Sequence, residues 1–336
     1  MKAVVVQAAN EPLVHVERDA PQPGPGELRV KVHACGICHS DHFVAQGLWP
    51  TLTLPRIPGH EVAGVVEAVG DGVTHFEPGD RVGIGWHGGH CGACNPCLAG
   101  HFIHCQTQGI TGITLDGGYA EAIVAPAIAF ARVPDDMDFA TAAPLLCAGV
   151  TTYNALRHAG ARPGDLVGIQ GLGGLGHLGV QYAHAMGFEV VAISRGADKE
   201  SFARDLGADH YVDTNAGEPA EQLQALGGAK AILATAPNAP AISALVGGLG
   251  IEGTLIVVGA PFDPLQIGAI DLISGDRSVR GWSSGTATDS TDALAFAQQT
   301  GVKPMLERYP LAEAQAGYDR MMSGKARFRV VLDVAQ

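Results

Sequence analysis

Four of the seven cysteines lie close together in the chain and have the spacing of a metal site. They are Cys91, Cys94, Cys97 and Cys105, in the pattern C-x2-C-x2-C-x7-C. Two-residue gaps let neighbouring thiolates bind one ion at about 2.3 Å, and four sulfur ligands suit tetrahedral zinc. The alternatives are an iron–sulfur cluster or buried cysteines that bind nothing. We predict structural zinc, because four protein ligands leave no coordination position for a substrate.

Four histidines flank this cysteine loop. They are His87, His90, His101 and His104. Because four thiolates already complete a tetrahedral coordination shell, the histidines are not needed as ligands. We interpret them as surface residues.

The remaining cysteines and several other histidines could also do chemistry, but their spacing alone does not select among them. They are Cys35, Cys38, Cys147, His39, His42 and His60. Cys35 and Cys38 have the C-x-x-C spacing of a redox motif, which normally begins a helix in a βαβ unit. Here the motif follows an ordinary β-type run at residues 28–32. The sequence therefore disfavours a redox role.

A glycine-rich turn follows the apolar run 166–170 and opens an amphipathic segment. Its residues are Gly171, Gly173, Gly174, Leu175 and Gly176. In a G-x-G-x-x-G turn the first glycine permits the tight bend, the second lets the backbone approach a pyrophosphate, and the third allows close helix packing. The pattern is weak by itself in a chain with 46 glycines, but here a strand precedes it and a helix and second strand follow. We predict binding of a nicotinamide dinucleotide.

The end of the second strand bears on the choice of dinucleotide. An NAD enzyme usually places an acidic residue there to bind the ribose 2′-hydroxyl, but this chain has Ser194 at that position. Arg195 and Lys199 could neutralise a 2′-phosphate, whereas Asp198 is a competing acid that could reach a ribose. We predict a preference for NADP(H), with NAD(H) as the alternative.

Five segments together resemble the zinc-dependent alcohol dehydrogenases of the medium-chain dehydrogenase/reductase superfamily, in order and in spacing. They are residues 35–41, Pro58-Gly59-His60-Glu61, the four-cysteine loop, residues 146–151 and the glycine turn. The resemblance spans essentially the whole chain and is closest to bacterial and yeast-type members. It implies that Cys38, His60 and Cys147 bind a catalytic zinc, and that Cys35 is a packing residue.

That ligand set has a physical rationale of its own. Two thiolates and a neutral imidazole leave zinc one open position, where it acts as a Lewis acid on an alcohol or carbonyl oxygen. By resemblance, Asp41 orients His60, and Glu61 can approach the zinc when water leaves. The alternative is that both carboxylates only hydrogen-bond within a loop.

The resemblance also assigns residues to the cofactor and to proton transfer. It implies that Ser40 relays a proton, that His39 contacts a cofactor phosphate, and that Thr151 packs beside the nicotinamide. Many relatives continue the relay with a histidine at the position of Phe43, whereas this chain has His42 one residue earlier. Treating the segment as strand-like, we expect His42 to face away from that position, so that protons leave through ribose hydroxyls and water.

Two tryptophans match positions where yeast-type relatives place indoles around the alcohol. Trp49 and Trp86 would fill much of a pocket, which favours small or unbranched primary alcohols and aldehydes, or flat aromatic ones. Alternatively, both only pack the β-rich module. The alternative activities are a polyol, cinnamyl-type or formaldehyde-adduct dehydrogenase on the same fold, or a non-enzymatic nucleotide-binding protein.

Composition limits the other classes of function. The net charge of the 336-residue chain is −13 and no basic patch is visible, which argues against a nucleic-acid partner. Only 16% of residues are charged and 46% are hydrophobic, so disorder is excluded and an oligomer is favoured. The N-terminus lacks signal-peptide features and no segment suits a bilayer, so we expect a cytoplasmic protein without membrane contact.

The pattern of elements changes near residue 150. Before it, short β-type runs alternate with turn clusters. After it, apolar strands alternate with helix-length segments, which indicates a doubly wound parallel sheet; the predicted strands are 166–170, 189–193, 210–213, 231–234 and 254–258. By resemblance we expect a GroES-like catalytic domain at residues 1–150, completed by 287–336, and a Rossmann domain at 151–286. We expect the active site in the cleft between them. We also expect a homo-tetramer, or a dimer, joined through the Rossmann sheets.

Overall fold

The structure is a computed structural model and describes residues 1–335. The chain divides into two compact units. The first, which we call the β-rich unit, comprises Met1–Val150, Gly285–Gln299 and the residues from Pro304 onward. The second, the parallel-sheet unit, comprises Thr151–Ser284 and Thr300–Lys303.

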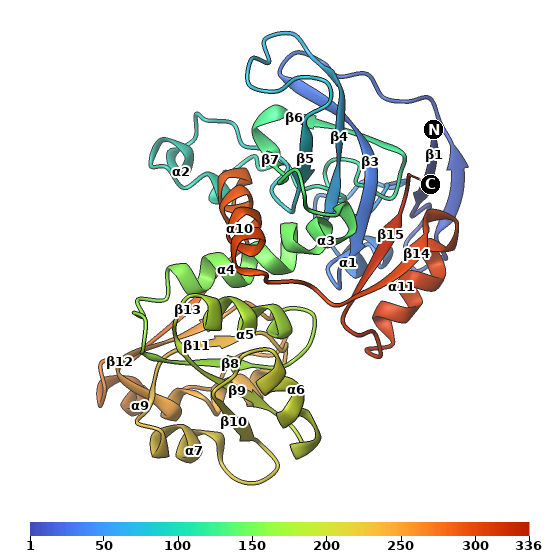
Figure 1. The fold of residues 1–336 in the computed structure, drawn as a ribbon. Coiled ribbons are helices and arrows are strands. Elements are labelled where there is room, and N and C mark those ends of the chain that lie inside the picture. The colour runs from blue at the N-terminus through green and yellow to red at the C-terminus, as the bar shows by residue number, and fades with distance from the viewer. Residues whose placement is uncertain (336) are drawn as a thin grey trace. The chain divides into compact units, whose positions relative to one another are not determined.

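The β-rich unit is built on a seven-stranded sheet and a separate two-stranded pair (Figure 1). The sheet has the order β14-β15-β3-β4-β5-β7, with β6 also paired to β3. Its strands are β3 (Glu27–Ile37), β4 (Val62–Val69), β5 (Arg81–Ile84), β6 (Ala122–Pro126), β7 (Phe130–Arg132), β14 (Leu306–Pro310) and β15 (Arg329–Asp333). The separate pair is β1 (Lys2–Val5) with β2 (Val14–Glu17).

Alternation of side chains sets the inner face of this sheet. Leu28, Val30 and Val32 of β3 are buried while the residues between them are more exposed, as expected for a strand with one face on a core. The last strand joins this sheet, because β15 pairs antiparallel with β3. The C-terminal run that we expected to rejoin the first module therefore does so.

Short helices connect and flank these strands. They are α1 (Asp41–Ala45), α2 (Asn95–Leu98), α3 (Phe139–Pro144), α10 (Ala287–Thr300) and α11 (Ala314–Met322). The next helix after α3, α4 (Val150–Arg157), belongs from Thr151 onward to the parallel-sheet unit. One turn of π-helix, Leu145–Gly149, lies between α3 and α4. The strand-like interpretation of the segment around His42 is wrong, because α1 begins at Asp41. The Asp41 carboxylate accepts the Cys38 amide at 3.0 Å, which turns the chain out of β3 and into the helix.

The parallel-sheet unit contains six parallel strands in the order β10-β9-β8-β11-β12-β13. They are β8 (Leu166–Gln170), β9 (Glu189–Ser194), β10 (His210–Asp213), β11 (Ala229–Ala234), β12 (Leu249–Val257) and β13 (Ser278–Gly281). The helices are α5 (Gly176–Ala185), α6 (Glu200–Asp205), α7 (Pro219–Ala225), α8 (Ala239–Ser243) and α9 (Ala269–Ile273). This is the doubly wound order of a Rossmann fold, with β8 central, and it confirms the predicted fold class.

Sequence analysis identified five of these strands and missed β13. This strand has four residues and is mostly exposed, so it lacks the apolar run that marks the others. Its place at the end of the sheet explains the exposure, since β12 is its one partner strand among residues 1–335.

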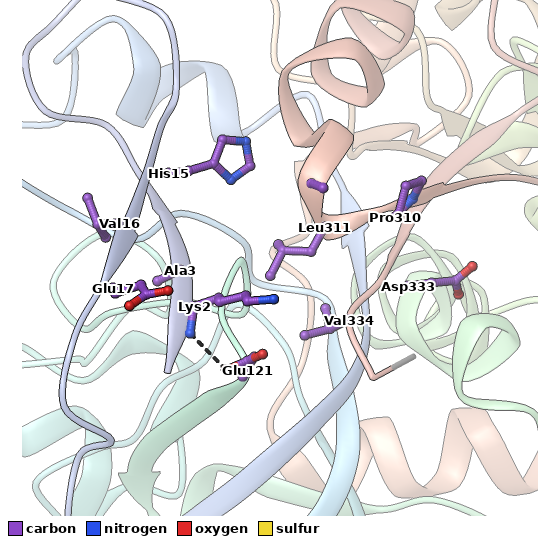
Figure 2. A pocket seen from close by; sticks show the side chains of 11 residues that line it. Lys2, Ala3, His15, Val16, Glu17, Glu121, Pro310, Leu311, Asp333 and Val334 are labelled. Carbon is purple, nitrogen blue, oxygen red and sulfur yellow. Dashed lines mark hydrogen bonds between the residues drawn. The ribbon is translucent and has the colours of Figure 1, made fainter.

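A hollow of about 390 Å³ lies beside β1 and β15 in the β-rich unit (Figure 2). Charged residues line it, but two of them are already engaged: Glu121 accepts the Lys2 amide at 2.7 Å, and Asp333 binds Arg308. None of the predicted site residues lines this hollow. Within residues 1–335, we also find that every helix is too short or too polar to cross a bilayer.

Candidate active site

Four predicted site residues from three distant parts of the chain come together in the β-rich unit. They are Cys38, His60, Glu61 and Cys147, and their potential ligand atoms all lie within 4.8 Å of one another. The Sγ atoms of Cys38 and Cys147 are 3.9 Å apart. Two sulfur ligands of a tetrahedral zinc with 2.3 Å bonds stand about 3.8 Å apart. The spacing of these donors therefore fits one zinc ion.

Local backbone structure brings these donors together. Cys38 follows the end of β3, His60 and Glu61 directly precede β4, and Cys147 lies in the π-helical turn. Gly36 in β3 makes room for one of them, since a Cβ at this position would lie 1.9 Å from Oε2 of Glu61. A single turn of π-helix is a frequent feature of functional sites.

A buried carboxylate and a tyrosine hold the imidazole of His60. Asp41 Oδ1 lies 3.0 Å from His60 Nδ1, and the Tyr119 hydroxyl donates to Asp41 Oδ2 at 2.9 Å. His60 and Asp41 are 1% and 3% exposed, so water does not compete for this bond. The other ring nitrogen of His60, Nε2, is buried without a hydrogen-bond partner. A carboxylate on one nitrogen and a vacant second nitrogen are what a zinc-binding histidine requires.

The ionisation of the cluster also suits a cation. Burial opposes a charged imidazole, but the nearby Asp41 carboxylate and Cys38 thiolate raise the pKa of His60 well above its usual value. A hydrogen bond from Cys147, against the effect of burial, lowers the pKa of the Cys38 thiol. The metal-free site therefore favours a Cys38 thiolate beside a protonated His60 ring. A zinc ion bound by these residues would displace the protons that the metal-free site holds.

Arg329 is a residue of this site that sequence analysis missed. Its Nη2 donates to Oε1 of Glu61, and the side chains of Arg329 and Glu61 are 6% and 0% exposed. Burial raises the pKa of Glu61 to about 7, although Arg329 favours the carboxylate. The available signal was an arginine at the start of an apolar strand, because a charged residue in a buried strand needs a partner.

The two tryptophans lie beside the imidazole of His60. The Trp86 ring meets the His60 ring edge to face, with centroids 5.1 Å apart, and the Trp49 ring meets Trp86 at 5.4 Å. Phe43 extends the group, 6.0 Å from Trp49. Both indoles also pack on a small hydrophobic cluster that includes Val44. The tryptophans therefore do pack within the β-rich unit, and their role as a pocket wall stays a prediction.

The residues assigned to proton transfer divide into two groups around α1. Ser40 is half-buried at the start of the helix, and its hydroxyl makes no capping hydrogen bond. His42 bonds instead to Tyr318 of α11, with 2.8 Å between Nδ1 and the hydroxyl. Residues two apart on a helix point about 200° apart, so His42 does not continue from Ser40. His39 is exposed and lies near His42, with ring centroids 5.8 Å apart.

The four cysteines of the loop also converge. All four sulfur atoms lie within 4.8 Å of one another, and Cys105 is 3.6 Å from Cys91. Backbone amides donate to these sulfurs: Ala93 and Cys94 to Cys91, and Cys91 to Cys105. These amides lower the pKa of Cys91 to about 6. Four convergent thiols with amide donors fit a structural zinc.

One of the flanking histidines is not a surface residue. His87 is 2% exposed, and its ring stacks on His90, which in turn stacks on Phe102. His87 also forms an isolated antiparallel bridge with Ile110, a contact that the cysteine spacing does not reveal. Burial lowers the pKa of His87 to about 4, so its ring is neutral at pH 7. His101 and His104 are exposed, as predicted.

The glycine turn joins β8 to α5 in the parallel-sheet unit. Gly171 has φ of 89°, and a Cβ at Gly176 would lie 1.7 Å from the Gly171 carbonyl oxygen, so both positions need glycine. A Cβ at Gly173 would meet nothing within 4 Å. Open space at Gly173 and the amides at the start of α5 suit a pyrophosphate.

The residues predicted to determine the preference for NADP(H) or NAD(H) lie at the end of β9 and in the turn after it. Ser194 is the last residue of this strand, and Arg195 and Asp198 are exposed beyond it. The Lys199 ammonium donates to the Arg195 carbonyl at 3.2 Å, so the lysine folds back over the turn. Thr151 is 8% exposed in α4.

Comparison with known proteins places the chain in a family. Residues 24–135 match the family described as alcohol dehydrogenase GroES-like domain, and residues 174–299 match the zinc-binding dehydrogenase family. The chain is 44% identical over 332 residues to alcohol dehydrogenase notN of Aspergillus sp. (strain MF297-2), covering 98% of this chain and 97% of that protein.

Solved structures agree in fold over nearly the whole length. A cinnamyl alcohol dehydrogenase from Sorghum bicolor superposes with a TM-score of 0.90 at 35% identity, covering 99% of this chain and 97% of that one. A structure titled CAD from Helicobacter pylori, complexed with NADP(H), gives 0.88 at 30% identity, covering 99% and 97%. Zinc and a nicotinamide dinucleotide are therefore the cofactors to be expected of this fold with these donor sets. The chain belongs to the zinc-dependent alcohol dehydrogenases of the medium-chain dehydrogenase/reductase superfamily.

Proposed function

We propose that the protein interconverts a primary alcohol and its aldehyde with NADP(H), using one catalytic and one structural zinc per chain. The observation that carries the proposal is the convergence of Cys38, His60 and Cys147 around an unpartnered imidazole nitrogen. Zinc bound there would polarise the substrate oxygen as a Lewis acid. The second zinc would occupy the four-cysteine loop.

The residues of the chain have distinct tasks in this reaction. Asp41 fixes the His60 ring, and Arg329 holds the Glu61 carboxylate in place. The Ser40 hydroxyl, which is not used to cap α1, takes up or supplies the substrate proton. Because Phe43 cannot carry a proton further, exchange with solvent runs through ribose hydroxyls and water. The glycine turn binds the dinucleotide through its backbone.

The experiment that tests the reaction combines metal analysis with a cofactor assay. Two zinc ions per chain are expected, together with aldehyde reduction that depends on NADPH and that phenanthroline abolishes. A protein that binds NADPH but reduces no aldehyde in a broad panel would overturn the enzymatic proposal in favour of a nucleotide-binding protein. One zinc per chain would overturn the two-site assignment.

The cofactor preference rests on the turn after β9. Two cations, Arg195 and Lys199, and the hydroxyl of Ser194 stand where a ribose-binding acid would otherwise be expected. Their charges favour a 2′-phosphate, which an exposed Asp198 only partly offsets. We expect kcat/KM to be higher for NADPH than for NADH; the reverse order would reject the preference.

The indoles beside His60 support a narrow pocket for small or flat substrates. Trp86→Ala should extend activity to branched and bulky alcohols, because it removes the ring that lies 5.1 Å from the imidazole. An unchanged substrate profile would remove Trp86 from the pocket wall. A panel of unbranched, cinnamyl-type, polyol and formaldehyde-adduct substrates separates the related activities. Flat cinnamyl-type alcohols are the favoured second candidate, since aromatic walls accommodate planar rings.

The exposed edge of the parallel sheet supports a homo-oligomer, which we propose to be a tetramer. In the part of the chain that the structure describes, β13 pairs with β12 alone, so its other edge is open to a second copy of the chain. Ile251, Ile270 and Ile273 are 70% or more exposed on β12 and α9, next to this edge in the sequence. Light scattering should give the mass of four chains. The mass of a single chain would reject the proposal. If the chains associate through the edge at β13, the double variant Ile270→Lys with Ile273→Glu should have a lower mass in solution than the wild type.

A further inference from the structure

The turn that follows β9 is tied to the neighbouring strand β10 at several points. Ser194 stands in register with Asp213, the last residue of β10, and the Ser194 carbonyl accepts the Thr214 amide at 3.0 Å. Most of the remaining contacts meet at a single residue of the turn, Gly196. Neither Tyr211 nor Asp213 of β10 has a part in the function proposed above.

The peptide groups of Gly196 are held on both sides. Its amide donates to Asp213 Oδ1 at 2.8 Å, and its carbonyl accepts a hydrogen bond of 2.6 Å from the Tyr211 hydroxyl. Gly196 has φ of 86°, in the region that favours glycine, so the turn has a conformation that other residues would strain. A Cβ there would also lie 2.4 Å from Asp198 Oδ1. The conformation of the turn is therefore specified by contacts from β10.

The carboxylate of Asp213 is occupied by backbone amides. Besides Gly196, its Oδ1 accepts the Asn215 amide at 2.9 Å. An acid at the end of a strand next to β9 could otherwise repel a 2′-phosphate or bind a ribose. Here two amides partly balance its charge, and the cations Arg195 and Lys199 stand on either side of the clamped glycine in the sequence.

We propose that Tyr211 and Asp213 are positioning residues for cofactor choice, which clamp Gly196 so that Ser194, Arg195 and Lys199 present a preformed site for the 2′-phosphate of NADP(H). The proposal rests on the NADP(H) preference proposed above. The two residues act through the turn and touch no reacting atom. Preorganisation of this kind improves affinity because the turn does not have to be ordered on binding.

The test of Tyr211 uses the whole enzyme and two probes that differ by the 2′-phosphate. Tyr211→Phe should raise the Kd of 2′,5′-ADP about three- to ten-fold, the effect of losing one hydrogen bond, while the Kd of 5′-AMP changes less than about two-fold. The KM for NADPH should rise in parallel and kcat should stay unchanged. Tyr309→Phe, in β14 of the other unit, is the matched control and should change neither probe. The role of Tyr211 is overturned if Tyr211→Phe weakens the binding of both probes equally. It is also overturned if the binding of neither probe changes.

Asp213 offers a conservative pair of substitutions. Asp213→Asn keeps an oxygen that can accept the Gly196 amide and removes the charge, so binding of 2′,5′-ADP should be retained or improved. Asp213→Ala removes the acceptor, and affinity for 2′,5′-ADP should fall by a similar factor to that of Tyr211→Phe. If the asparagine variant loses as much affinity as the alanine variant, the clamp is not what Asp213 contributes.

Arg195→Ala separates this inference from the cofactor preference on which it rests. In one outcome the wild-type enzyme prefers NADPH, Arg195→Ala reverses this preference, and Tyr211→Phe does not affect it. The cofactor preference then holds, and the proposed positioning role of Tyr211 and Asp213 is wrong. If the wild-type enzyme prefers NADH and Arg195→Ala is silent, the proposed cofactor preference fails and the clamp fails with it.

Discussion

The two cysteine-containing clusters of the β-rich unit are built in opposite ways. The loop cluster takes all four donors from residues 91–105, and backbone amides of the loop itself support the sulfurs. The buried cluster takes its donors from three segments, at positions 38, 60–61 and 147, and side chains support it. The loop cluster is formed within one short segment and offers four sulfur donors. The buried cluster is assembled from distant segments by the fold and offers sulfur, nitrogen and oxygen donors.

This difference separates structural from catalytic chemistry. Four thiolates complete a tetrahedron and leave nothing for a substrate, whereas two thiolates and an imidazole leave a position open. The open site also has to control its ligands more tightly. Asp41, Tyr119 and Arg329 do this by fixing His60 and Glu61, all in surroundings that exclude water.

Removing a donor from the buried cluster should have the largest effect on turnover. Cys147→Ala leaves too few ligands to hold the zinc in place, so kcat/KM should fall by about 10³-fold or more, while the Kd for the dinucleotide stays near the wild-type value. Steady-state kinetics and a fluorescence titration with NADPH measure the two quantities.

Cys35→Ala is the matched control for this experiment. Cys35 is also buried, but it donates to a neighbouring backbone carbonyl and is not one of the four converging residues. The control should retain zinc and activity. Equal losses in both variants would mean that Cys147 contributes packing rather than a metal ligand.

Removing the buried arginine should have the next largest effect, on stability. Arg329→Met leaves the fully buried Glu61 carboxyl without its cation, and its pKa of about 7 then rises further. Keeping the charge or taking up a proton should cost at most about 3–5 kcal/mol. Denaturant unfolding measures this cost. The double variant Arg329→Met with Glu61→Gln should recover part of it, since no unpaired charge is then buried. If the losses of unfolding free energy in the two single variants simply add in the double variant, the pairing is contradicted. The control is Arg308→Met: the Arg308 side chain is 51% exposed, so this variant should cost less than about 1 kcal/mol.

Breaking the loop cluster should affect stability more than chemistry. Cys97→Ser should remove one zinc and lower Tm by about 3–6 °C, the equivalent of about 2–4 kcal/mol in a chain of 336 residues. Because the loop supplies no residue to the buried cluster, kcat of the folded variant at low temperature should remain within about two-fold of wild type. A loss of turnover as large as that of Cys147→Ala would show that the two clusters are not independent.

The contrast between the clusters also explains how far the sequence could predict the site. The loop is readable from spacing because its donors are neighbours in the chain. Spacing could not select Cys38, His60 and Cys147 from the other cysteines and histidines, and only the family resemblance did so. Arg329 was missed because its partner lies 268 positions away, a pairing that depends on β15 joining β3.

The fold shows the same limit. Strands with continuous apolar runs, such as β8 and β10, were predicted with the bounds that the structure has. The short edge strand β13 was missed because it has no apolar run. The helix α1 was interpreted as strand because a side-chain contact from Asp41 determines where the helix begins. His87 was placed on the surface because its burial involves a bridge to Ile110, which lies beyond the cysteine loop in the chain. Periodicity predicts elements that bury a face; it does not predict turns that single polar contacts determine.

A half-buried Arg–Glu pair provides the reference for the fully buried one, and its loss should have the smallest effect. Arg320 binds both oxygens of Glu307 at 2.7 and 3.0 Å, and these hydrogen bonds lower the pKa of Glu307 below its usual value of 4.5. Glu307→Gln should therefore cost at most about 1 kcal/mol at pH 7. Since the folded-state pKa lies below the unfolded value, the stabilisation is complete above pH 4.5 and is lost as pH falls through the folded-state pKa. The unfolding free energies of variant and wild type should converge below that pH. A difference that persists in acid would mean that Glu307 contributes packing instead of charge. The half-buried pair would then no longer serve as the reference for Arg329 and Glu61.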